Sequence, residues 1–170
     1  MVGARKGRCR MLTVRFLSVG SLKEAYLKRA CEEYAKRLSG FCRVEQVEIK
    51  ETRLPDHPTS GEIAAAVRTE GKALLTAAGE RSYKIALCVE GTQFSSEELS
   101  RKLETVVAGG ASVISFFIGS SYGLSPEVKS NADLCLSFSK LTFPHQLMRV
   151  LLYETVYRCM NIQKGTSYHK

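Results

Sequence analysis

The sequence predicts an α/β domain, in which a mostly parallel sheet carries helices on both faces. Short runs of β-branched and aromatic residues alternate with segments of helical periodicity along the whole chain. With 170 residues, of which 44% are hydrophobic and 25% charged, the chain is long enough for one continuous core. No internal repeat or long linker divides it. We therefore expect a single domain over residues 11–170, preceded by a basic extension, residues 1–10, that is either disordered or foreign to the native protein.

Five apolar runs are predicted as strands, at 12–19, 44–49, 83–89, 113–118 and 134–138. Helices are predicted between and after them, over 22–39, 60–78, 96–108, 126–131 and 145–164. Strand and helix alternate throughout, and connections of this kind join parallel strands.

The helix boundaries rest on local signals. Two pairs of residues have the spacing of a capping box, Thr59 with Glu62 and Ser95 with Glu98. Ser125 followed by Pro126 is typical of a helix start, and Ser21 is the expected N-cap of the first helix. Gly40, Gly109 and Gly165 are expected to end helices.

Two strand ends carry unusual loops, and they define the candidate site. In open α/β sheets, ligands bind outside the carboxyl ends of the strands. Gly119 and Gly123 bracket the loop after the fourth predicted strand, where missing β-carbons let the backbone approach a ligand or form a tight turn. The next loop, 138–143, is apolar although connections are normally polar, so we expect a ligand, a subunit or the protein itself to cover it.

Polar residues of the last helix and the chain end are the other candidates. His145 is a possible general base or phosphate contact, or a helix cap. Arg149 is a possible phosphate ligand, or the partner of Glu154. The aromatic and basic tail, with Tyr168 and His169, suits RNA binding, although chain ends often fray.

Composition narrows the class of protein. The net charge is +8, but Arg5, Lys6, Arg8 and Arg10 supply four of these charges, so the rest of the chain is only mildly basic. No signal peptide or membrane span is evident, which predicts a soluble cytoplasmic protein. The six cysteines lack the spacing of a zinc site or a redox dithiol, so we expect reduced thiols and no metal.

The sequence resembles a known family at four places. These are FSKLTFPHQLMRV at 138–150, YETVYR at 153–158, SYHK at 167–170, and the opening strand MLTVRFLSVG at 11–20. They resemble the ribosomal RNA large subunit methyltransferase H family of the SPOUT class. The resemblance implies a homodimer with a deep C-terminal trefoil knot. It also implies methyl transfer from S-adenosylmethionine to N3 of pseudouridine 1915, in helix 69 of 23S rRNA within the assembled 70S ribosome.

The resemblance also implies roles for individual residues. The cofactor site would be lined by Leu87, Gly119, Phe138, Ser139, Lys140, Leu141, Thr142 and Phe143. For that reaction, our own hypothesis from the residues takes Arg149, Tyr168 and His169 as RNA contacts, and His145, Glu154 or His169 as the base that removes the N3 proton. Ser120 departs from the family, which usually has a second glycine there; a positive φ at this position would cost serine about 1 kcal/mol.

Two other functions stay open at this point. A non-catalytic ribosome- or RNA-binding α/β protein would use the same tail without affinity for S-adenosylmethionine. A nucleotide-binding α/β protein would need a phosphate cradle, and the chain contains neither GxGxxG nor GxxxxGK[ST]. The modest charge of the chain favours a protein that recognises the whole ribosome rather than naked RNA.

Overall fold

The computed structural model describes residues 11–169, and the side chains of residues 11–168. The predicted basic extension at 1–10 and the final Lys170 lie outside the described residues. The strands are β1 (Thr13–Val19), β2 (Arg43–Ile49), β3 (Tyr83–Thr92), β4 (Val113–Ile118) and β5 (Leu134–Leu136). The helices are α1 (Ala25–Leu38), α2 (Ser60–Ala78), α3 (Ser96–Ala108), α4 (Pro126–Ser130) and α5 (His145–Lys164), followed by a 3₁₀ turn at Ser167–His169.

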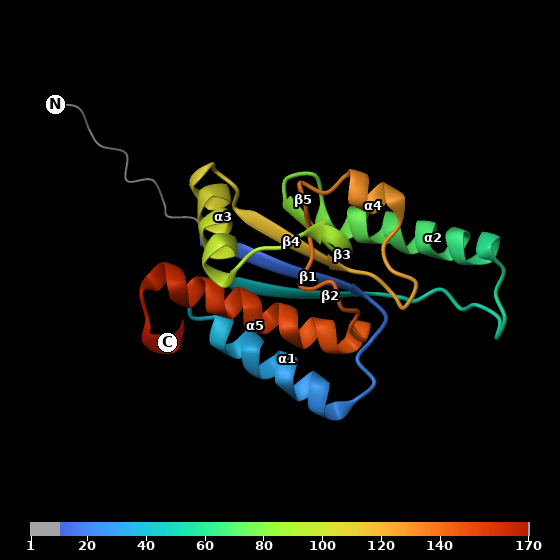
Figure 1. Cartoon of the computed structure of the whole chain (residues 1–170), viewed down its shortest axis with the longest axis horizontal. Coiled ribbons are helices and arrows are strands. Elements are labelled where there is room, and N and C mark those ends of the chain that lie inside the picture. The colour runs from blue at the N-terminus through green and yellow to red at the C-terminus, as the bar shows by residue number, and fades with distance from the viewer. Residues whose placement is uncertain (1–10, 170) are drawn as a thin grey trace.

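The five strands form one parallel sheet in the order β2-β1-β4-β3-β5, which confirms the predicted fold class. Helices α1, α3 and α5 pack on one face, and α2 and α4 pack on the other. In Figure 1, α5 lies beside α1 under the sheet, whereas α2 runs along the opposite side. Because all strands point the same way, their carboxyl ends and the loops that follow them gather at one edge.

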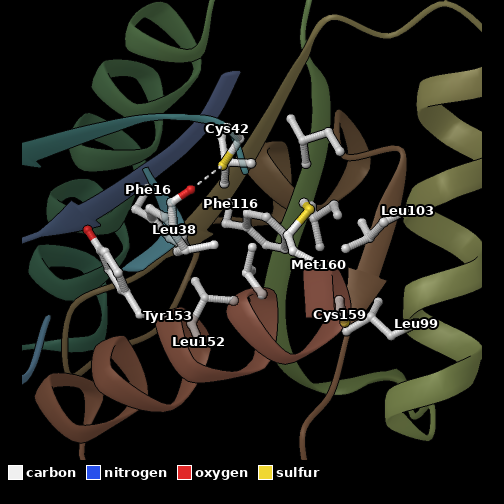
Figure 2. Packing of buried hydrophobic residues seen from close by; sticks show 14 of the residues in the cluster. Phe16, Leu38, Cys42, Leu99, Leu103, Phe116, Leu152, Tyr153, Cys159 and Met160 are labelled. Carbon is white, nitrogen blue, oxygen red and sulfur yellow. Dashed lines mark hydrogen bonds between the residues drawn. The ribbon is translucent and has the colours of Figure 1, made fainter. Parts of the chain in front are cut away.

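The larger of the two cores lies between the sheet and the helices α1, α3 and α5 (Figure 2). Phe16 of β1 stacks on Tyr153 of α5, with ring centroids 3.8 Å apart, and on Phe116 of β4 at 5.8 Å. Leu103 of α3 and Leu152 of α5 are also buried in this core. Each fully buried side chain of this size contributes about 1.5–3 kcal/mol relative to exposure, so this layer anchors α5 firmly beneath the sheet.

Most helix boundaries follow the predicted signals. Both capping boxes are present, and the Ser125 hydroxyl accepts a hydrogen bond from the Val128 amide at the start of α4. The prediction that Ser21 caps α1 is wrong, because α1 begins at Ala25 and no side chain caps it. The preceding turn is held by α5 instead: the Lys23 amide donates to Gln146, and Arg149 donates to the Gly20 carbonyl.

The edge of the sheet around β5 also differs from the prediction. Strand β3 continues to Thr92, past an irregularity after Leu87, and β5 stops at Leu136 instead of Phe138. Thr92 takes over as the partner of the β5 end, since its carbonyl accepts a hydrogen bond from the Ser137 amide at 3.0 Å. This rearrangement releases residues 138–143 from the sheet and leaves them available to line the site.

The trefoil knot implied by the family resemblance stays a prediction. Sheet order and helix packing are compatible with it, but sequence rules give no means to derive a threaded chain. Within residues 11–169, none of the helices combines the length and the apolar character required to cross a bilayer.

Candidate functional site

A cavity of about 400 Å³ opens at the carboxyl ends of β3, β4 and β5. Its wall is formed by residues 87–90, 118–121, 123, 124, 129, 136–139, 141–145 and 148. The loops after β4 and β5, which the sequence predicted as the candidate site, therefore face each other across one pocket. They meet because the strands are parallel and their carboxyl ends share an edge.

The loop after β4 is folded tightly on itself. The Gly123 amide donates to the Ser120 carbonyl at 2.9 Å, and Gly123 has a φ of +81°. A β-carbon on Gly119 would lie 2.2 Å from the Gly123 carbonyl oxygen, so only glycine fits there. No non-glycine residue within 11–169 has a positive φ, so Ser120 carries none of the backbone strain that a positive φ would impose on a serine.

The loop after β5 supplies most of the predicted cofactor residues. Five of its six members line the cavity: Phe138, Ser139, Leu141, Thr142 and Phe143. Leu87 and Gly119 line it as well, whereas Lys140 is exposed and lies outside the wall. The Ser139 hydroxyl accepts a hydrogen bond from the Leu141 amide at 3.0 Å and so shapes the loop from within. Leu141 is nevertheless 70% exposed, which leaves an apolar side chain at the cavity mouth.

Two charged residues of the wall escaped sequence analysis. Glu90 follows the apolar part of β3, and Lys129 extends from α4 to form an ion pair with it. The hydrogen bond from Lys129 lowers the pKa of the Glu90 carboxyl below its ordinary value. The position of Glu90 at the end of a predicted strand was the available signal, since strand ends collect ligand contacts. The sequence around Lys129 contains no such signal, because the ion pair of Lys129 with Glu90 depends on how α4 packs against the sheet.

Of the three candidate bases, His145 lines the cavity, where α5 begins. Glu154 lies two and a half turns further along α5 and is absent from the wall. Its carboxylate accepts hydrogen bonds from Arg158, at 3.0 Å from Nε and 2.6 Å from Nη2. The His169 side chain lies outside the described residues.

Arg149 is turned inward. It is 7% exposed, and its guanidinium donates to the Gly20 carbonyl at 3.2 Å and to the Glu48 carboxylate at 2.5 Å. The alternative pairing of Arg149 with Glu154 is not formed: residues five apart on a helix do not face each other, whereas Glu154 and Arg158 are four apart and do. Arg149 thus joins α5 to the ends of β1 and β2, and its role as an RNA contact stays a prediction.

The tail folds back onto the middle of α5. The Tyr168 ring meets Tyr157 edge-on at 4.8 Å and lies 5.0 Å from the Arg158 guanidinium carbon. Its hydroxyl donates to Glu154 at 3.3 Å. Burial, together with a hydrogen bond to Tyr34, raises the pKa of Tyr168 to about 12. The α5 residues that Tyr168 contacts lie 9–13 positions after His145 of the cavity wall, so at a rise of about 1.5 Å per residue they stand roughly 14–20 Å along the helix from it.

The cavity is suited to a ligand of the size and character of S-adenosylmethionine. Pockets for organic ligands of this size measure about 300–1,000 Å³ and are mostly apolar with a few polar groups. Here Leu87, Leu124 and Phe138 offer apolar surface for a flat ring, and Ser139 and Thr142 carry hydroxyls. The protein's own side chains leave the space open. Among residues 11–168, no group of three or more His, Cys, Asp and Glu side chains is placed to hold a metal ion.

Solved structures share this fold. The chain superposes with a TM-score of 0.54 on a probable methylase family protein from Haemophilus influenzae, over 92% of this chain and 70% of that one, at 13% identity. A probable methyltransferase from Bordetella pertussis also gives 0.54, over 86% and 95%, at 14% identity. At such low identity, the likeness concerns the fold alone.

Sequence comparison gives the class of protein. Residues 12–169 match the family model described as "Predicted SPOUT methyltransferase". The chain is also similar over 159 residues to proteins named ribosomal RNA large subunit methyltransferase H, at 46% identity for Streptococcus thermophilus and 42% for Shouchella clausii. Each alignment covers 94% of this chain and the whole of the relative. The chain therefore belongs to the ribosomal RNA large subunit methyltransferase H family of SPOUT methyltransferases, as the sequence resemblance predicted. Membership in this family supports S-adenosylmethionine as its methyl donor.

Proposed function

We propose that this chain methylates 23S rRNA at N3 of a pseudouridine, position 1915 in helix 69, with S-adenosylmethionine as donor. The observation that carries the proposal is the cavity at the ends of β3, β4 and β5, whose walls are the two loops that the family resemblance assigns to the cofactor. The names of the full-length relatives support ribosomal RNA of the large subunit as the substrate.

The protein's main contribution to this reaction would be to bind S-adenosylmethionine and to orient it toward the acceptor base. Bound S-adenosylmethionine would supply an activated methyl group on its sulfonium sulfur. The loops 119–123 and 138–143 would grip the donor from opposite sides and exclude water, so that the methyl group faces the acceptor. His145 is placed in the same wall, where its ring nitrogen could take up the proton that leaves the acceptor nitrogen. Glu90 is a second candidate base in the wall, although the hydrogen bond from Lys129 lowers its pKa and so disfavours proton uptake.

We further propose that two copies of the chain form the active enzyme in the cytoplasm. Tyr168 docks on the side of α5 roughly 14–20 Å along the helix from His145, so an RNA contact by Tyr168 or His169 next to the methyl group is more readily made by the tail of a second copy. Val89 and Leu141 of the cavity wall are exposed apolar side chains, and so is Tyr122, which lies between two wall residues in the chain. Clusters of this kind often mark a protein interface. Sedimentation equilibrium would show a mass of twice 18.8 kDa if this is right.

Two measurements test the activity. Calorimetric titration with S-adenosylmethionine should show binding, which a non-catalytic RNA-binding protein would lack. Mapping of modified nucleotides in rRNA from a deletion strain should then show loss of one methyl group at the proposed pseudouridine, restored by the intact gene. An unchanged modification pattern would refute the substrate, and a nucleoside triphosphate that binds more tightly than S-adenosylmethionine would favour the nucleotide-binding alternative.

The substrate form and the tail can be tested in vitro. Assembled 70S ribosomes should be methylated faster than isolated 23S rRNA, and a preference for free RNA would contradict the proposal. Replacing His169 and deleting Lys170 should lower methylation while cofactor affinity stays nearly unchanged. Equal loss of both would mean that the tail supports the fold.

A further inference from the structure

A buried glutamate stands directly behind the cofactor loop and touches it. Glu70 lies in the middle of α2 and is only 4% exposed, and Ser120 of the loop after β4 is 6% exposed. The Ser120 hydroxyl donates to Glu70 Oε2 at 3.1 Å. Ser120 also lines the cavity, so one residue faces the ligand space and the helix behind it.

The second carboxylate oxygen of Glu70 is used as well. The Thr52 amide, in the connection between β2 and α2, donates to Oε1 at 2.8 Å. The Glu70 side chain therefore joins the connection between β2 and α2, through Thr52, to the loop after β4, through Ser120. Buried polar groups are costly unless they are hydrogen-bonded, so this arrangement fixes all three partners together.

Neighbouring contacts make α2 a rigid support. A β-carbon on Gly71 would lie 2.3 Å from the Ser125 hydroxyl oxygen and 3.0 Å from Val128 Cγ2, which shows how closely α2 approaches the start of α4. The loop is thus held at both ends. Its Ser120 end is tied to Glu70, and the Ser125 end is packed against Gly71.

We infer that Glu70 and Ser120 form a tether that positions the cofactor loop, and that Ser120 thereby sets the affinity of this chain for S-adenosylmethionine. The inference rests on the proposed function, because it assigns the cavity to that donor. Ser120 and Glu70 are positioning residues: they hold Gly119 and Gly123 in the cavity wall. Without the tether, part of the binding free energy would be spent on ordering the loop.

Four proteins test the tether by calorimetric titration with S-adenosylmethionine. Ser120→Ala should weaken binding about tenfold, which corresponds to about 1.4 kcal/mol. Glu70→Gln should bind close to the wild type, because its amide oxygen can accept from Thr52 while its NH₂ donates to the Ser120 oxygen. Ser100→Ala is the matched control: this buried hydroxyl makes one hydrogen bond, to the Cys159 carbonyl at 2.9 Å, on the other face of the sheet.

Thermal unfolding separates positioning from stability. Ser120→Ala and Ser100→Ala should both lower the melting temperature, but only Ser120→Ala should raise Kd and KM for the donor, with kcat at saturation retained. Equal binding by Ser120→Ala and the wild type would overturn the inference and leave the proposed function intact. So would a Glu70→Gln defect as large as that of Ser120→Ala, which would assign the effect to charge. A wild-type chain that does not bind the donor would overturn both.

Discussion

Arg149→Met should destabilise the folded chain without any RNA present. The guanidinium is buried between α5 and the ends of β1 and β2, where it donates to the Gly20 carbonyl and to Glu48. Methionine keeps the aliphatic length of the side chain but removes both hydrogen bonds. Because Arg149 is also a predicted RNA contact, the variant distinguishes a role in folding from a role in binding.

The size of the effect follows from the two partners. Gly20 is partly buried, and the loss of the hydrogen bond to its carbonyl costs about 1–3 kcal/mol. Glu48 is 44% exposed in its side chain, so solvent screens that half of the interaction and its loss adds about 1 kcal/mol. Together these give about 2–4 kcal/mol. For a chain of 170 residues, each kcal/mol lowers the melting temperature by about 2–4 °C.

Urea unfolding followed by circular dichroism measures this directly. Arg37→Met is a suitable control, because its pair with Glu33 joins two exposed side chains one helical turn apart and should hardly affect the unfolding midpoint. The reasoning would be refuted if Arg149→Met unfolded at the wild-type midpoint and instead raised the KM for ribosomes. That result would restore Arg149 as a phosphate contact.

Three further predictions concern the cavity, a helix cap and the thiols. Gly119→Ala should abolish measurable S-adenosylmethionine binding in calorimetry, because its β-carbon would overlap the Gly123 carbonyl; wild-type affinity would show that the loop yields easily. Thr59→Ala should cost about 1 kcal/mol in urea unfolding through loss of the α2 cap, and no loss would contradict the capping box. Burial raises the pKa of Cys42 and of Cys88 to about 11, so at pH 8 both thiols should stay protonated and label slowly with iodoacetamide. Cys88, which lines the cavity, should label before the fully buried Cys42, and bound cofactor should slow it; peptide mass mapping that finds Cys42 first would contradict the packing.

Local sequence determined the elements and the place of the site. Helix starts at Thr59, Ser95 and Ser125 could be predicted because a cap depends on residues within one turn. The loops at 119–123 and 138–143 could be identified because their residues are unusual for the ends of strands. The two loops were expected to meet because strands and helices alternate in the sequence, which predicts a parallel sheet. In a parallel sheet, the loops after the strands lie at one edge.

Contacts between distant segments were decided only by the tertiary structure. Arg149 donates hydrogen bonds to Glu48 and to the Gly20 carbonyl, and Ser120 donates one to Glu70. In each case the two residues are 50 or more positions apart in the chain. No periodicity or spacing encodes such pairs, because they depend on how helices settle on the two faces of the sheet. The same packing moved the start of α1 away from Ser21. The local sequence therefore determined which loops form the candidate site, whereas tertiary packing decided which polar side chains face the cavity and which are used in contacts between distant segments.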